Sequence, residues 1–105
     1  MIFQTGAALL EACVLAVLSR GETYGYVLTQ DIKSVIDVSE STLYPVLRRL
    51  QKDGLLSAFD RPFSGRNRRY YALTETGADA LQSYRREWAA YKKSINQILH
   101  GGVEE

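Results

Sequence analysis

The sequence has one cysteine, Cys13, and one histidine, His100, among 105 residues. An intramolecular disulfide is therefore impossible, and a metal site built from cysteine and histidine would have too few ligands. Cys13 lies between Ala12 and Val14 in an apolar stretch, whereas reactive thiols need an accessible, electropositive setting. We therefore expect Cys13 to be a small buried hydrophobic residue.

The chain also lacks the patterns that mark membrane proteins and enzymes. Its apolar run over residues 7–18 is interrupted by Glu11 and is too short to cross a bilayer. No basic stretch precedes this run and no clear secretory cleavage site follows it, which predicts a cytoplasmic protein. No Ser/His/Asp set, glycine-rich phosphate loop or metal-ligand cluster is recognisable, so we expect neither an enzyme nor a cofactor.

Length and composition predict one globular domain. The 105 residues are 46% hydrophobic and 24% charged, which excludes a disordered chain. A chain of this size can build one modest core, and a partner chain would add to it.

Positive charge is concentrated in the middle of the chain. The net charge is only +1, yet residues 48–71 carry seven basic and two acidic side chains. Part of this segment has strand-like flanks around a turn at residues 64–65, which predicts a hairpin with a cationic tip. Such a tip favours binding of a polyanion. Its arginines are Arg61, Arg66, Arg68 and Arg69.

Helical and strand periodicities give the order helix, helix, turn, helix, two-stranded hairpin and long helix. The first helix is expected over residues 5–18, and the strands over residues 55–59 and 68–73. The second helix is expected from an N-cap at Thr23 to about Ile36. The third is expected from Ser39 or Ser41 to Gly54, and a cap at Ser41 would leave Pro45 in the first turn, where proline is tolerated.

The last helix has the clearest periodicity in the chain. Thr74 is its expected cap, and about 26 residues would make it about 39 Å long. Its apolar residues are spaced 3, 4, 3, 4, 3, which is an a/d heptad seam, and they are Leu81, Tyr84, Trp88, Tyr91, Ile95 and Ile98. A domain this small cannot bury both ends of such a helix. We expect the seam to pack on a second copy, the alternative being the first helix of the same chain.

These elements predict a mainly α fold with a small β-hairpin, namely a winged helix-turn-helix followed by a long dimerisation helix. Residues 1–74 would form the DNA-binding unit, residues 75–100 the dimerisation helix and residues 101–105 a frayed tail. The third helix of this fold enters the major groove, where base edges can be distinguished. The residues off its buried stripe are the expected contacts: Ser41, Thr42, Tyr44, Pro45, Arg48 and Arg49. Tyr24, at the start of the second helix, would meet a phosphate or pack in the core.

Two segments resemble the PadR family of transcriptional regulators. Residues 41–55, STLYPVLRRLQKDGL, resemble the family's recognition helix. Residues 65–77, GRNRRYYALTETG, resemble its wing and the start of its dimerisation helix, and residues 23–26 loosely match the start of the second helix. The resemblance covers essentially the whole chain. It is similar to the compact branch of the family, which includes multidrug-sensing repressors.

This resemblance implies a homodimeric repressor on a near-palindromic DNA operator. It assigns the family's helix tyrosine to Tyr44, and the basic residues of the wing to the segment around Asn67, namely Arg66, Arg68 and Arg69. In the compact branch a planar aromatic effector can enter a pore between the subunits. The implied pore residues are Trp88, Thr5, Ala8 and Ala12. Lys92 follows Trp88 by one turn, where drug-sensing relatives can carry an acid, which argues against cationic drugs.

Two alternatives stay open at this point. Trp88 would serve equally well as an ordinary residue of the dimer core. A winged helix can also act as a protein-interaction module without DNA, although such a module does not need the basic segment over residues 48–71.

Overall fold

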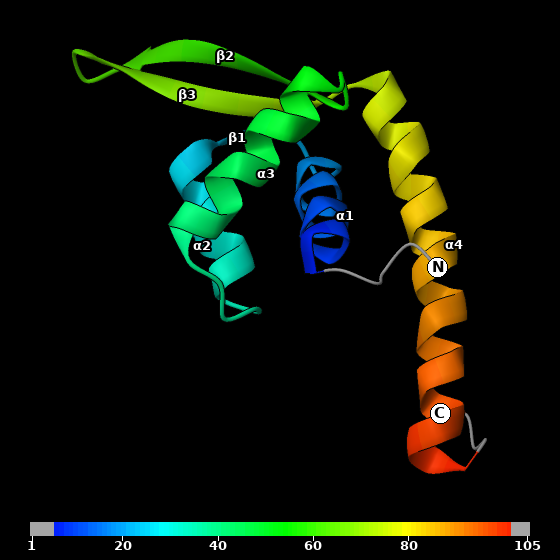
Figure 1. The fold of residues 1–105 in the computed structure, drawn as a ribbon. Helices are drawn as coiled ribbons and strands as arrows, with labels where there is room; N and C mark the ends of the chain where they lie inside the picture. Colours follow the sequence, from blue (N-terminus) through cyan, green and yellow to red (C-terminus); the bar gives the residue numbers. More distant parts are fainter. Residues whose placement is uncertain (1–5, 102–105) are drawn as a thin grey trace.

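The computed structural model describes residues 6–101 of the chain. Three helices form its body, a sheet projects from one side of the body and a long helix runs down the other (Figure 1). The elements in chain order are α1 (Gly6–Leu18), β1 (Thr23–Tyr24), α2 (Gly25–Lys33), α3 (Glu40–Lys52), β2 (Leu56–Phe63), β3 (Arg66–Leu73) and α4 (Glu75–His100). The fold is therefore mainly α with a small sheet, as predicted.

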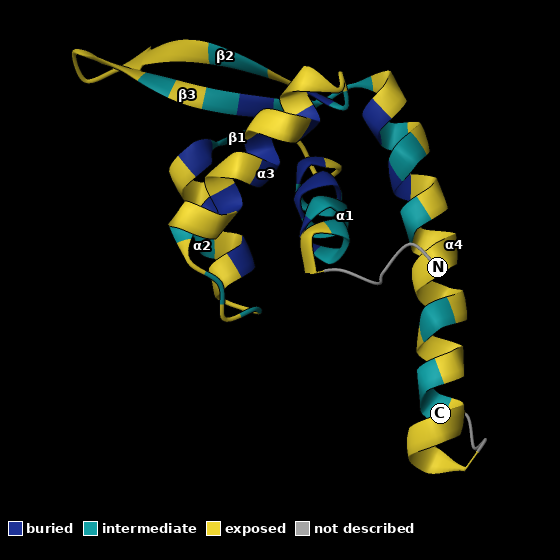
Figure 2. Ribbon diagram, viewed as in Figure 1, coloured by how far each residue is buried: buried dark blue, intermediate teal, exposed yellow. Residues whose placement is uncertain are grey.

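The core lies where α1 meets the other helices and the base of the sheet (Figure 2). α1 is apolar on nearly every face, and Val14 and Leu15 are fully buried. A helix of this kind needs neighbours all round it, and α1 accordingly packs against α2, α3, β3 and α4. Within residues 6–101, none of the helices combines the length and the apolar character that a membrane crossing requires.

The second helix differs from its prediction at both ends. Thr23 lies in β1 instead of capping a helix, and the N-cap is Tyr24, which makes no capping hydrogen bond through its side chain. The helix ends at Lys33 instead of Ile36, and the Ser34 hydroxyl donates to the Asp31 carbonyl at 2.7 Å. Serine competes for backbone groups in this way, which favours a helix end over continuation.

The cap of α3 is the earlier of the two predicted serines, and not the one that would have left Pro45 in the first turn. Ser39 is the N-cap, because its hydroxyl accepts from the Thr42 amide at 3.3 Å. Ser41 lies inside the first turn, and its hydroxyl hydrogen-bonds to that of Ser39 at 2.9 Å. Pro45 is therefore inside the helix, where it cannot donate the backbone hydrogen bond to the carbonyl four residues earlier.

The sheet has three antiparallel strands in the order β1-β3-β2. β2 and β3 are longer than predicted and pair along their whole length, from Leu56 opposite Leu73 to Phe63 opposite Arg66. Ser64 and Gly65 form the connecting turn, as predicted, and both have positive φ, at 49° and 78°. Two successive positive φ values are those of the type I′ turn, whose twist suits a tight hairpin. We call the paired β2 and β3 with this turn the wing.

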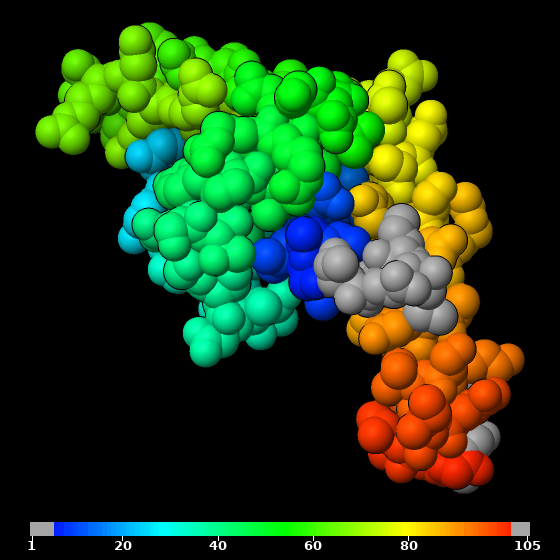
Figure 3. Space-filling view, viewed as in Figure 1, coloured from blue at the N-terminus to red at the C-terminus, as the bar shows by residue number. Residues whose placement is uncertain are grey.

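α4 is the 26-residue helix that the sequence predicts. The Thr74 hydroxyl caps it by accepting from the Gly77 amide at 3.0 Å, and Gly101 ends it in the left-handed region. The rest of the predicted tail, residues 102–105, lies outside the described residues. The molecule measures 57 × 27 × 21 Å because the C-terminal half of α4 extends beyond the body (Figure 3).

Candidate nucleic-acid interface

The exposed face of α3 carries hydroxyl, aromatic and cationic side chains. Leu43, Val46, Leu47 and Leu50 are buried on one side of the helix, which leaves the opposite side to solvent. The exposed residues include five of the predicted contacts, Ser41, Thr42, Tyr44, Pro45 and Arg48. Such a face can donate and accept hydrogen bonds at base edges and can bind phosphate.

The inner face of the wing, which is turned toward the helices, joins this surface. Arg69 is exposed, and its Nε lies 3.6 Å from Oδ1 of Asp60 on the paired strand. Burial raises the pKa of Tyr71 above its usual value, while the guanidinium groups of Arg69 and Arg48 act in the opposite direction. Charges from both α3 and β3 therefore act on the Tyr71 hydroxyl, and the side chains of α3 and the wing adjoin one another in the space-filling view (Figure 3).

Arg49 is held differently from the other predicted contacts. Its Nε donates to the Glu11 carboxylate on α1 at 2.9 Å. The other oxygen of that carboxylate accepts from the Tyr84 hydroxyl of α4 at 3.0 Å. Burial, followed by the nearby Glu11 charge, raises the pKa of Tyr84 to about 12. Glu11 therefore connects α1, α3 and α4, and Arg49 belongs to this connection.

The remaining wing residues fall into two groups. Arg66 and Asn67 are exposed next to the turn. Arg61 and Arg68 are paired opposite each other on the outer face, which is turned away from the helices, and their guanidinium groups lie over aromatic rings. Tyr24 is half-buried on the same outer face, with Arg68 over its ring at 4.7 Å.

The heptad residues of α4 do not share one environment. Leu81 is buried against the body and Tyr84 packs on the core, so this end of the seam docks within the chain. Trp88 is 44% exposed and Ile98 is 79% exposed, while Tyr91 and Ile95 are partly exposed. The packing within one chain therefore covers only the beginning of the seam.

A cavity of about 260 Å³ lies between α1 and α4. Its lining includes two of the predicted effector residues, Trp88 and Ala12, together with Tyr84. Ala8 and Lys92, also predicted, are not among the residues that line it; Ala8 lies one helical turn before Ala12, and Lys92 lies one turn after Trp88. Thr5, the remaining predicted effector residue, lies outside the described residues.

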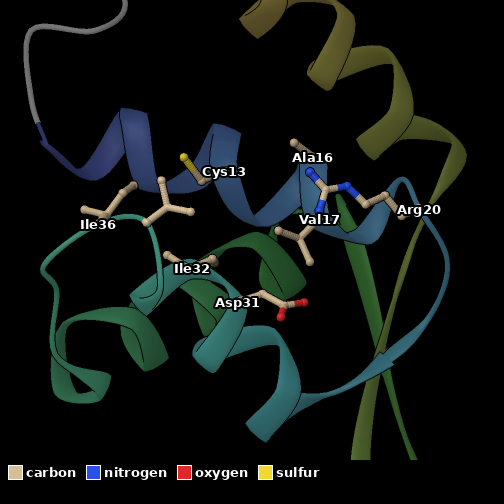
Figure 4. Close-up of a pocket in the computed structure, with 8 residues that line it drawn as sticks. Cys13, Ala16, Val17, Arg20, Asp31, Ile32 and Ile36 are labelled. Carbon is tan, nitrogen blue, oxygen red and sulfur yellow. The ribbon is translucent and has the colours of Figure 1, made fainter.

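A second cavity, of about 190 Å³, separates α1 from α2 and has Arg20 and Asp31 at its edge (Figure 4). Cys13 borders both cavities. It was predicted to be buried, but the structure leaves it partly exposed. Burial raises the pKa of its thiol, which disfavours the reactive thiolate.

Comparison with known proteins decides the family. The model of the transcriptional regulator PadR-like family matches residues 14–83, which is more than half of the chain. The chain belongs to the PadR-like family of transcriptional regulators. The predicted family and fold are therefore confirmed, and members of this family are regulators of transcription rather than enzymes.

Individual proteins resemble the chain over most of its length. A transcriptional regulator of Mycobacterium tuberculosis is 41% identical over 81 residues, which cover 76% of this chain and 73% of that protein. A crystal structure from Streptococcus mutans UA159 is 39% identical, covers 100% of this chain and 99% of that one, and has a TM-score of 0.86. A PadR-like transcriptional regulator from Bacillus cereus is 33% identical with a TM-score of 0.79, covering 88% of this chain and 92% of that one.

Three features of α3, the wing and their neighbours were not predicted from the sequence. They are β1, the contacts of Glu11 with Arg49 and Tyr84, and the stacking of Arg61 and Arg68 on aromatic rings. The stacking does have a sequence signal, because a two-residue turn at 64–65 fixes the register and places residues 61 and 68 opposite each other. Glu11 has no comparable signal, since its partners lie 38 and 73 positions away.

Proposed function

We propose that this PadR-family chain is a cytoplasmic, homodimeric repressor that binds a near-palindromic DNA operator. In this proposal α3 lies in the major groove and the wing grips the flanking backbone. The observation that carries it is the exposed face of α3, with Tyr44 and Arg48, which adjoins the wing that exposes Arg69. Side chains on α3 can select bases, whereas wing arginines add electrostatic affinity.

Mobility shift on the DNA upstream of the protein's own gene tests this proposal. Replacing Arg48 by alanine should weaken binding to the preferred site by about 1–3 kcal/mol and relax selectivity at one base pair. Replacing Arg66 and Arg69 together should weaken binding to all sequences and flatten its salt dependence. Arg86→Ala on α4 removes a charge from another element and is the matched control.

The DNA proposal fails if the wild type binds no better than the Arg66/Arg69 double variant in moderate salt. It also fails if Arg86→Ala has the same effect as that variant, because the basic surface would then act only through net charge. A protein-interaction module without DNA binding would give the first of these results.

Dimerisation through α4 is the second part of the proposal. The C-terminal half of α4 extends beyond the body and leaves Ile98 79% exposed. A monomer rarely exposes a row of large apolar side chains, whereas a second copy could cover it along the heptad seam. Two copies related by a twofold axis would present two α3 helices to two half-sites.

Light scattering after gel filtration tests the dimer. The wild type should have twice the 11.8 kDa mass of one chain, and Ile98→Glu should shift the population toward monomer because it places a charge in the seam. Gln97→Glu adds the same charge one residue away and should remain dimeric. A monomeric wild type at micromolar concentration would refute the dimer.

We also propose that a planar aromatic effector occupies the cavity between α1 and α4 and stacks on Trp88. The cavity of about 260 Å³ is slightly below the usual range of ligand pockets, roughly 300–1,000 Å³, and a second copy would enlarge it. Trp88 is the only tryptophan, so its fluorescence reports occupancy directly. Titration with a panel of neutral and cationic aromatic compounds should quench this signal and weaken DNA binding. No quenching across the panel, with unchanged DNA affinity, would refute the effector site.

A further inference from the structure

The outer face of the wing is a ladder of alternating rings and guanidinium groups. The strand register places Phe59 opposite Tyr70, Arg61 opposite Arg68 and Phe63 opposite Arg66. Tyr24 of β1 extends the row, because it lies opposite Tyr70. Side chains alternate between the two faces of a strand, so this row points away from Tyr71, which is buried on the inner face.

Arg68 lies between two rings of this ladder. Its guanidinium carbon is 3.7 Å from the centre of the Phe63 ring and 4.7 Å from the centre of the Tyr24 ring. Arg68 is also less exposed than its neighbours Asn67 and Arg69. It therefore ties the outer end of β2, at Phe63, to β1 at the base of the sheet.

Arg61 is held in a similar way on the neighbouring strand. Its guanidinium carbon is 4.7 Å from the Tyr70 ring centre and 5.2 Å from that of Phe59, and these two rings stack at 5.8 Å. Arg61 also forms an ion pair with Glu22, which precedes β1. The positive charge of Arg61 is therefore already paired with a carboxylate of the same chain.

We propose that Arg61 and Arg68 are positioning residues that hold the wing rigid, and that neither is a phosphate ligand. The proposal rests on the proposed DNA-binding function. The surface expected to face DNA includes α3, the inner face of the wing with Arg69, and the exposed tip with Arg66 and Asn67. Arg66 shares the outer row with Arg61 and Arg68, but it ends that row beside the turn and is exposed there. Arg61 and Arg68 lie farther from the tip, where aromatic rings hold them on the face turned away from the helices. Of the four arginines in the hairpin, two would then bind DNA and two would keep the hairpin in place.

Amide hydrogen exchange on the free protein tests the positioning role without DNA. Arg68→Ala should make the amides of β2 and β3 near the turn exchange roughly five- to thirty-fold faster, because two ring contacts are lost. Phe63→Leu should act in the same direction although it changes no charge. Arg66→Ala is the matched control and should leave these amides unchanged. Wild-type exchange rates in both Arg68→Ala and Phe63→Leu would overturn the proposal.

The salt dependence of DNA binding tests the second half of the proposal. Loss of one phosphate contact lowers the slope of log K against log salt by about one. Arg66→Ala should show this change, whereas Arg68→Ala and Phe63→Leu should weaken binding at every salt concentration with the wild-type slope. A slope reduced by about one in Arg68→Ala would make Arg68 a phosphate ligand and overturn the proposal. If the wild type does not bind DNA at all, the proposed function fails, and the exchange measurement still decides the positioning role.

Discussion

Gly77 is the position at which the smallest substitution should have the largest effect. It is the third residue of α4 and is buried against the connection that precedes the wing. A Cβ atom added there would lie 1.8 Å from the carbonyl oxygen of Leu55 and 2.8 Å from Cδ1 of Leu73. The Leu55 carbonyl already accepts from the Thr74 amide at 3.3 Å. If either the Leu55 oxygen or the start of α4 moved to make room, this hydrogen bond would break.

The cost of Gly77→Ala can be assembled from these contacts. Alanine in a helix gains about 1 kcal/mol over glycine. Overpacking costs about 1–3 kcal/mol, and loss of the Thr74 cap and of the Thr74–Leu55 hydrogen bond costs about 1 kcal/mol each. The free energy of unfolding should therefore fall by about 2–4 kcal/mol, which corresponds to a decrease in Tm of roughly 10–30 °C for a domain of this size.

Thermal unfolding followed by circular dichroism measures this change. All proteins must be compared at one concentration, because dimerisation would make Tm depend on it. Gly6→Ala in α1 is the control, since an added Cβ there meets nothing within 4 Å, and its Tm should equal or slightly exceed that of the wild type. A Gly77→Ala protein that melts at the wild-type temperature would refute the reasoning.

Three further predictions concern caps and buried hydrogen bonds. Ser39→Ala should lower the free energy of unfolding by about 1 kcal/mol and Ser41→Ala by much less, because only Ser39 caps α3; the reverse order in urea denaturation would favour Ser41. Glu11→Ala should cost about 1–3 kcal/mol in the same assay, because the Tyr84 hydroxyl loses its acceptor, and wild-type stability would contradict this. The pKa of Tyr84 is raised from 10.0 to about 12, so its contribution is complete below pH 10 and is lost between pH 10 and 12. Tyr84→Phe should remove that part of the alkaline loss of stability, and an unchanged pH profile would show that the hydroxyl does not contribute.

Much of the fold could be predicted because local signals and tertiary packing agree. The apolar run of α1, the heptad seam of α4, the cap at Thr74 and the turn at residues 64–65 all lie where the sequence indicates them. The family also followed from two contiguous segments. In each of these cases, the residues that define the feature are close together in the chain.

The boundaries that the sequence did not settle are of two kinds. In one, neighbouring residues compete to cap the same helix; in the other, a strand pairs with a segment that is distant in the chain. Ser39 and Ser41 are both good caps, and an interior Pro45 seemed too costly, yet the helix begins at the earlier serine. Thr23 looked like a cap because its pairing with Tyr71, in β3, is not visible in the local sequence. The polar residues near the wing turn lack apolar alternation, so only the hairpin register reveals that they are strand.

The candidate site was predictable as a set of side chains but not as an arrangement. Helical spacing correctly indicated the exposed residues of α3, and composition indicated a cationic hairpin. The division of the arginines between the two faces of the wing depends on the register of the strands. The ion pair of Arg49 could not be predicted either, because its partner Glu11 is distant in sequence.

The shared carboxylate of Glu11 affects how mutagenesis of α3 should be interpreted. Arg49 lies in α3, the proposed recognition helix, beside Arg48, so a loss of DNA binding after its replacement would ordinarily be interpreted as a lost phosphate contact. The same change also removes the partner of an acid that is bound to Tyr84 in α4. An alanine scan of α3 would therefore combine DNA contact with helix anchorage at this one position. Replacing Glu11 alongside Arg49 separates the two effects, because Glu11 lies on α1, outside the proposed DNA surface.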